Sequence, residues 1–237
     1  MALPISSAAV AAPTDLILWS LVTRLGEAEI LLPAVLLAAF WLAFGAKQGR
    51  LTLRWLGLIA VAATITTATK IAFIGWAMGS AALDFTGVSG HAMFATASYP
   101  MLFWVLLMHR GPWAQRIGVV FGFAVGLLVA YSRLPTHAHS PSEVYAGLLL
   151  GCTVSLLTVK LPRSGPAVPL WLPALTLVGL SILPFYAPPS HTHDWVTRVS
   201  LRLSGNEQPF TRAEMHQRER ERQSGRAVVF LTSSITA

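Results

Sequence analysis

Seven residues of this 237-residue chain carry groups that phosphoryl transfer needs. They lie in four short segments at the ends of apolar stretches: Lys70, Ser89, Gly90, His91, Arg133, His139 and Glu143. One histidine can attack phosphorus and a second can protonate the leaving alkoxide, because imidazole changes charge near neutral pH. Phosphate esters hydrolyse so slowly unaided that several such groups must be positioned in advance.

The remaining groups of this set bind and orient. Lys70 and Arg133 can neutralise phosphate oxygens, and a guanidinium can hold two of them at once. Ser89 and Gly90 precede a predicted helix, so their backbone N–H groups can point at an anion where the helix dipole is positive. Glu143 is a carboxylate that can fix the tautomer of an attacking histidine and stabilise its charged form. Together these types indicate a phosphoryl-transfer site.

The elements that must position these residues are predicted to be membrane helices. Hydrophobic residues make up 54% of the chain and charged residues only 11%, whereas about 25% charged residues is usual in a globular domain. Six apolar blocks, each near the length of a membrane crossing, run approximately over 28–46, 55–76, 91–108, 117–131, 143–159 and 168–186. Because lipid offers the backbone no hydrogen-bond partner, the blocks should be α-helices.

The predicted fold class is therefore all-α, a polytopic membrane protein with six transmembrane helices. A short helix over 15–26 should precede them at the membrane interface. The predicted regions are an N-terminal segment, 1–27, a transmembrane domain, 28–186, and a polar C-terminal tail, 187–237. The Arg/Glu-rich run 218–222 makes this tail typical of a solvated helix or a disordered segment. Glycines four residues apart, such as Gly122 and Gly126, favour close helix packing.

Charges in the short loops orient the predicted helices. Three loops on one side carry seven cations: Lys47, Arg50, Arg54, Arg110, Arg116, Lys160 and Arg163. The positive-inside rule makes this side cytoplasmic. These loops account for much of the net charge of +7, so nucleic acid is not needed as a partner. The four polar segments then meet at the outer face of the membrane.

The same residues resemble two signatures of the type 2 phosphatidic acid phosphatase superfamily. Its third signature, Ser-Arg, five residues, His, three residues, Asp, is matched by Ser132, Arg133, His139 and Glu143. Its second, Pro-Ser-Gly-His, resembles the run Val-Ser-Gly-His at 88–91. The resemblance covers roughly residues 24–186 and leaves the tail unexplained.

This resemblance implies a role for each site residue. His139 would be the nucleophile that forms a phosphohistidine, Glu143 its orienting partner, and His91 the general acid. The phosphate-binding residues would be Lys70, Ser89, Gly90 and Arg133. The resemblance implies neither a metal nor a cofactor.

The chain also departs from the superfamily pattern. The first signature is Lys, six residues, Arg-Pro, but here Ala77 and Met78 stand six residues after Lys70. One expected phosphate cation is therefore missing, which puts full activity in doubt. Arg24 or an arginine of the tail could replace it, although no sequence feature favours either. Glu143 itself stands where the signature has aspartate.

Several of these residues have simpler interpretations. Ser140, Pro141 and Glu143 form a helix capping box, so the carboxylate could be structural as well as catalytic. Lys70 could extend toward the lipid headgroups instead of binding phosphate. Asp84, in the loop between the second and third blocks, is expected to be a solvated loop acid.

The resulting hypothesis is a metal-independent lipid phosphate phosphatase at the outer leaflet of a plasma membrane. The arginine-rich composition suggests a bacterium and its inner membrane, and the resemblance suggests undecaprenyl diphosphate, phosphatidate, phosphatidylglycerol phosphate or a lipid A phosphate as substrate. Two alternatives stay open: a catalytically silent member that binds headgroups or a protein partner, and a small transporter subunit. A transport pathway would more often place polar groups at the membrane midplane. The lipid, the oligomeric state and the role of the tail are not indicated.

Overall fold

The computed structural model describes residues 13–159, 166–169, 171–186 and 192–235 and places most of them in helices. The α-helices are α1 (Pro13–Arg24), α2 (Ala28–Phe40), α3 (Gly49–Trp76), α4 (Gly90–Leu106), α5 (Pro112–Ser132), α6 (Pro141–Thr158), α7 (Trp171–Tyr186), α8 (Thr192–Ser204) and α9 (Arg212–Ile235). A π-helical turn, Trp41–Gly45, extends α2, and a 3₁₀ turn, Met108–Arg110, follows α4. The described residues contain no β-strand, so the all-α prediction is confirmed.

Each predicted apolar block contains a helix. That these six helices all cross a membrane stays a prediction. By length and hydropathy, three stretches of the described chain could cross a membrane: Asp15–Gly45, Gly49–Trp76 and Pro112–Ser132. Helices α4, α6 and α7 are shorter, at 17, 18 and 16 residues, which is close to the lower limit of about 17 for a crossing. The first stretch combines α1 with α2, so the interfacial position of α1 also stays a prediction.

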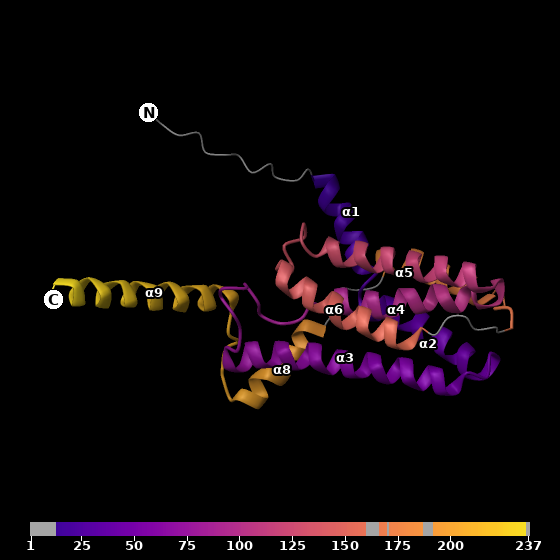
Figure 1. Cartoon of the computed structure of the whole chain (residues 1–237), viewed down its shortest axis with the longest axis horizontal. Helices are drawn as coiled ribbons and strands as arrows, with labels where there is room; N and C mark the ends of the chain where they lie inside the picture. The colour runs from indigo at the N-terminus through magenta and orange to yellow at the C-terminus, as the bar shows by residue number, and fades with distance from the viewer. Residues whose placement is uncertain (1–12, 160–165, 170, 187–191, 236–237) are drawn as a thin grey trace.

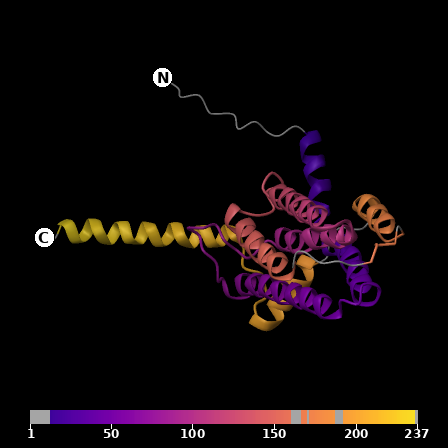
Figure 2. The same ribbon diagram turned by 45° about the vertical axis from the view of Figure 1, so that its right-hand side comes forward.

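Helix α4 lies at the centre of the bundle, with α3, α5 and α6 around it (Figure 2). Glycines let two neighbours approach it closely. A Cβ added to Gly126 of α5 would lie 2.9 Å from Thr96 Cγ2. One added to Gly147 of α6 would lie 2.5 Å from the carbonyl oxygen of Ser89. The predicted close packing of the Gly122 and Gly126 face is confirmed, and the first turns of α6 lie against the N-terminus of α4.

Polar side chains fix other elements against α4. The Trp55 indole N–H of α3 donates to the Ala97 carbonyl at 3.0 Å. The Tyr99 hydroxyl of α4 donates to the Leu25 carbonyl, also at 3.0 Å, in the connection between α1 and α2. Such bonds matter in an apolar interior, because a buried polar group without a hydrogen-bond partner destabilises the fold by its uncompensated desolvation. They fix the residues just before α2 and the N-terminal part of α3 at set heights along α4.

The described part of the C-terminal tail contains helices α8 and α9, and a helix is one of the two structures expected from its composition. Helix α8 packs along α3. In the connection from α8 to α9, the Phe210 N–H donates to the Ile74 carbonyl near the C-terminal end of α3. A small apolar cluster holds both helices there: Phe73, Ile74, Val196 and Met215. The rest of α9 projects away from the bundle (Figure 1). The composition of the tail does not reveal this docking, because the apolar contacts are few and are divided between two polar helices. The three-region division of the chain stays a prediction.

The predicted site residues and the basic loops lie at opposite ends of the helices. Lys70 is near the C-terminal end of α3, whereas Arg50 is near its start. Helix α4 runs from Gly90 to the turn that contains Arg110. Helix α5 then returns from the basic end to Arg133. The cations at 160 and 163 lie outside the described residues.

Candidate active site

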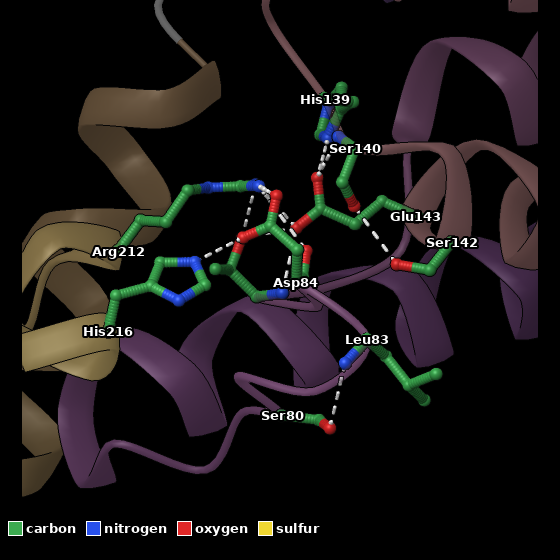
Figure 3. Close-up of polar contacts among 10 residues, drawn as sticks. Ser80, Leu83, Asp84, His139, Ser140, Ser142, Glu143, Arg212 and His216 are labelled. Carbon is green, nitrogen blue, oxygen red and sulfur yellow. Dashed lines mark hydrogen bonds and ion pairs between the residues drawn. The ribbon is translucent and has the colours of Figure 1, made fainter. Parts of the chain in front are cut away.

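Glu143 lies at the centre of a polar cluster that includes its hydrogen-bond partners His139, Thr86 and Arg212. Its side chain is 0% exposed. It is the third residue of α6, and its Oε2 accepts the backbone N–H of Ser140 at 3.1 Å, which forms the predicted capping box. The same oxygen lies 2.7 Å from Nδ1 of His139 (Figure 3). The carboxylate therefore caps the helix and holds the histidine at once. A residue four positions before Glu143 reaches it because the capping turn folds His139 back over the helix start.

The other carboxylate oxygen of Glu143 is held by groups from elsewhere in the chain. Its Oε1 accepts the backbone N–H of Thr86 at 2.7 Å and the hydroxyl of the same residue. It also accepts Nη2 of Arg212, from the first turn of α9, at 2.8 Å. Neither contact was predicted from the sequence. Full burial of a carboxylate is tolerable here because each oxygen has several donors and one partner is a cation.

His139 lies in the loop between α5 and α6, with 13% of its side chain exposed. Its backbone N–H donates to the Arg133 carbonyl at 3.4 Å, which ties this loop to the end of α5. Burial lowers the pKa of the His139 ring below its usual value, and the hydrogen bond to Glu143 opposes this effect. The lowered pKa favours the neutral form of the ring at pH 7. Since Nδ1 is engaged by Glu143, Nε2 is the nitrogen that can attack an electrophile.

The N-terminus of α4 is joined directly to that of α6. Ser89 is the N-cap of α4 and is fully buried. Its backbone N–H donates to the Glu143 carbonyl at 3.1 Å. Its hydroxyl has no partner among the described residues. Gly90 is the first residue of the helix, so its N–H has no acceptor within the helix and lies at the positive end of the helix dipole.

His91 follows at the second position of α4, within electrostatic range of His139, Arg133 and Lys70. The turn between α1 and α2 covers it from one side. A Cβ added to Gly26 would lie 3.1 Å from Cβ of His91. Glycine at 26 thus permits this close approach. The structure brings both predicted histidines into one polar cluster.

Arg133, at the end of α5, extends toward the N-terminal segment. Its Nη1 donates to the Thr23 hydroxyl at 2.5 Å, whereas its buried Nε has no partner among the described residues. Glu27, also buried, lies within electrostatic range of this guanidinium and pairs with Arg24 at 3.5 Å. The segment before α2 is therefore part of the site's surroundings. No spacing rule in the sequence connects 23 to 133.

Lys70 lies beneath the loop that leads into α4. A Cβ added to Gly87, whose φ is +149°, would lie 2.9 Å from Cγ of Lys70. The Val88 N–H donates to the Thr69 hydroxyl at 3.1 Å, which fixes the loop to α3. The Lys70 ammonium is within electrostatic range of Arg133 and Glu143. All seven predicted site residues thus come together at one end of the bundle.

Ala77 and Met78, which stand where the first signature has Arg-Pro, lie just after the end of α3. Helix α3 ends at Trp76, Ala77 caps it in a left-handed conformation, and Met78 is exposed. Of the two replacements considered, Arg24 pairs with Glu27. Arg212 reaches the cluster but binds carboxylates there. Asp84, expected to be simply solvated, is one of those carboxylates.

Comparisons with known proteins identify relatives of this chain. The family model of the PAP2 superfamily matches residues 7–164. A Klebsiella pneumoniae protein described as an uncharacterized 22.5 kDa protein in the cps region is 31% identical over 203 residues, covering 84% of this chain and 97% of that protein. The undecaprenyl-diphosphatase of Sulfolobus acidocaldarius is 32% identical over 83 residues, covering 35% of this chain and 36% of that protein. No solved structure matches this chain.

Proposed function

The chain belongs to the PAP2 superfamily, and from this premise we propose that it hydrolyses a lipid phosphate or diphosphate at the outer leaflet through a phosphohistidine. The family and the diphosphatase relative support a phosphatase-type function in general. The lipid substrate, the histidine intermediate, the metal independence and the side of the membrane are our proposals.

The observation that carries the proposal is the pair formed by His139 and Glu143. A neutral imidazole with Nδ1 held at 2.7 Å by a buried carboxylate presents Nε2 as a nucleophile. When Nε2 bonds to phosphorus, the ring becomes cationic, and the carboxylate stabilises that charge. This is the arrangement that covalent catalysis by a histidine requires.

Four groups around this pair are proposed to bind the transferred phosphoryl group: Lys70, Ser89, Gly90 and Arg133. The hydroxyl of Ser89 and Nε of Arg133 are buried donors without a partner among the described residues. Buried polar groups in proteins normally have a partner, so unpaired donors beside a cationic cluster favour an anionic ligand. Two cations and the end of a helix supply the positive potential that a phosphoryl group needs.

We propose that the reaction takes two steps. As His139 Nε2 attacks, the bond from phosphorus to the leaving oxygen breaks, and His91 donates a proton to that oxygen. In the second step water attacks the phosphohistidine, His91 takes the proton from this water, and the N–P bond breaks. Inorganic phosphate leaves when the substrate is a monoester or a terminal diphosphate, and His139 returns to its neutral form. Both histidines therefore end each cycle as they began it.

The relatives and the surroundings of the site support the substrate class that we propose. The Sulfolobus relative is named for undecaprenyl diphosphate, which makes a polyprenyl diphosphate one candidate beside phosphatidate, phosphatidylglycerol phosphate and lipid A phosphates. The cluster stands at the end of apolar helices opposite to the basic loops. A lipid whose chains lie in the bilayer would place its phosphate headgroup at the level of this cluster. We therefore place the enzyme in the plasma (inner) membrane with its site facing outward.

Hydrolysis of a lipid panel tests this proposal. Purified protein with a chelator should release phosphate from at least one of the four candidate lipids. His139→Ala and His91→Ala should abolish release without lowering the melting temperature. His109→Ala, at the opposite end of α4 and exposed, is the matched control and should remain active. An alkaline quench should trap phosphate on His139, detectable by mass spectrometry.

One alternative has a specific observation in its favour. Ala77 and Met78 stand where the superfamily's first signature has a cation, which favours a silent member that binds headgroups without hydrolysing them. Binding of all panel lipids without release of phosphate from any would support this alternative against the enzyme. Release that survives His139→Ala would reject the phosphohistidine instead.

A further inference from the structure

Arg212 links three residues of the polar cluster to the C-terminal tail. Its Nη2 donates to Glu143 Oε1 at 2.8 Å and to the Thr86 hydroxyl at 3.3 Å. Its Nη1 donates to Asp84 Oδ2 at 2.6 Å. One turn further along α9, His216 Nε2 lies 2.7 Å from the other oxygen of Asp84. Figure 3 shows both side chains of α9 pointing into this cluster.

The backbone that carries Arg212 is docked firmly. The Phe210 N–H donates to the Ile74 carbonyl at 3.0 Å, and the Asn206 amide donates to the Gly75 carbonyl at 2.7 Å. Both acceptors are in the last turn of α3, where helix carbonyls lack partners of their own. The ring of Phe210 also packs edge-on against that of Phe73, with centroids 5.4 Å apart. The tail therefore satisfies the end of α3 and holds Arg212 above Glu143.

Glu143 is thus held between two opposed groups. His139 engages Oε2 at 2.7 Å, and Arg212 engages Oε1 at 2.8 Å. A carboxylate is planar, so fixing one oxygen also sets the direction in which the other points. The ring of His139 takes its orientation from Oε2. The position of Arg212 is consequently transmitted to the ring through one rigid group.

We propose that Arg212 is a positioning residue of the active site, which holds Glu143 and thereby aims His139, so that the C-terminal tail is part of the catalytic unit. This inference rests on the proposed roles of His139 and Glu143. It assigns a use to the part of the chain that lies beyond residues 7–164, the range matched by the family model.

The contacts of Arg212 distinguish positioning from phosphate binding. Both of its terminal nitrogens already donate to carboxylate oxygens, on Asp84 and Glu143. A phosphate would have to displace one of these ion pairs to be bound by the same nitrogens. Arg212 therefore does not take the place of the cation missing at Ala77 and Met78.

The charge of Arg212 also predicts a change in pH dependence. Glu143 contacts the ring of His139, and Lys70, Arg133 and His91 face it from the other packed elements. Arg212 adds a positive charge behind the carboxylate, which opposes protonation of the ring. Removing that charge should raise the pKa of His139. Since only the neutral ring can attack, the acid limb of the rate profile should move to higher pH.

The first experiment compares three single variants of the full chain. Arg212→Gln should lower kcat about 10- to 100-fold with KM changed less than about twofold, because the substrate does not contact it. Its acid limb should move up by roughly half a pH unit. Arg212→Lys should recover part of kcat and the original acid limb. Arg220→Gln, an exposed arginine on the same helix, is the control and should equal the wild type.

Two truncations and a spectroscopic measurement complete the test. Removing residues 223–237 keeps Arg212 and His216 and should leave kcat unchanged, whereas removing 206–237 should lower it at least as far as Arg212→Gln. Histidine NMR titration reports the pKa of His139 without any substrate. An active wild type with unchanged kcat and pH profile in Arg212→Gln would overturn the inference. If no lipid is hydrolysed, the proposed function fails. Independently of hydrolysis, a pKa of His139 that is the same in Arg212→Gln and the wild type would overturn the inference.

Discussion

At the scale of the residue, Glu143 combines a structural and a chemical role in one side chain. Its Oε2 accepts the Ser140 N–H and the His139 ring, at 3.1 and 2.7 Å. Both partners come from the four residues before it, so the capping box and the pair with histidine are consequences of one local turn. Oε1 is free of that turn and binds Thr86 and Arg212 from distant segments. The carboxylate is thereby the point where local and long-range structure meet.

Replacing Glu143 by glutamine tests its chemical role separately from its capping role. Glu143→Gln keeps an oxygen for the capping box but loses the charge that stabilises a cationic His139. We expect kcat of the folded protein to fall roughly 10³-fold. The melting temperature should fall as well, because the amide nitrogen that replaces Oε1 cannot accept from Thr86 and Arg212. The Glu143 carboxylate raises the pKa of His139, so removing its charge should lower that pKa and move the acid limb to lower pH. This shift is opposite in sign to the one expected for Arg212→Gln.

Glu143→Asp is the matched control, because it keeps the charge and matches the residue of the superfamily signature. It should retain activity within about tenfold of the wild type, since only the position of the charge changes. Equal kcat values for the glutamine variant and the wild type would contradict the orienting role. The measurement is the pH dependence of phosphate release from the lipid that proves to be hydrolysed.

At the scale of the element, small residues decide how α6 lies on α4. Gly147 and Gly151 of α6 face Ser89, Met93 and Thr96 of α4 with no room for a side chain. This contact brings the start of α6 beside the N-cap of α4, where the Ser89 N–H meets the Glu143 carbonyl. The distance between the two halves of the site is thus set by glycines that have no chemical role themselves.

An alanine at Gly151 should separate these helices. Its Cβ would collide with Thr96 Oγ1 and the Met93 carbonyl oxygen, so α6 would have to shift. We expect a destabilisation of about 1–3 kcal/mol and a loss of phosphatase activity larger than the loss of folded protein. Thermal unfolding in detergent and kcat measured on the folded fraction would show both effects.

Gly57→Ala is the control for that substitution. A Cβ at this position of α3 meets nothing within 4 Å. Because alanine favours a helix over glycine by about 1 kcal/mol, the variant should be as stable as the wild type or more so. Equal stability of the Gly151 and Gly57 variants would contradict the packing role assigned to α6.

At the scale of the whole molecule, the chain is polarised along its helices. One end carries the polar cluster and the docked start of the tail, and the other carries the basic turns around Arg50 and Arg110. This polarity is the basis for placing the site outside, because cations are retained on the cytoplasmic side. Projection of α9 from the site end (Figure 1) would then carry it away from the cytoplasm.

Cysteine labelling in intact cells tests this orientation. With the natural Cys152 replaced by serine, we expect Leu83→Cys, 64% exposed in the loop at the site end, to react with a membrane-impermeant maleimide. Trp113→Cys, 75% exposed at the opposite end, should react only after the membrane is permeabilised. Reversed labelling would move the site to the cytoplasmic leaflet and change the lipids it can reach.

The sequence by itself determined the helices and the identity of the core chemical groups. Long apolar blocks must be helical in lipid, and the spacing of His139 and Glu143 lies within one turn, so local geometry already pairs them. Thr86, Thr23 and Arg212 could not be predicted in the same way. They reach the site from loops and helices far away in the chain, and no periodicity records which of fourteen arginines will face a buried carboxylate. Only tertiary packing decided that, because the docking of the tail on α3 and the close contact of α4 with α6 bring those segments to the same place.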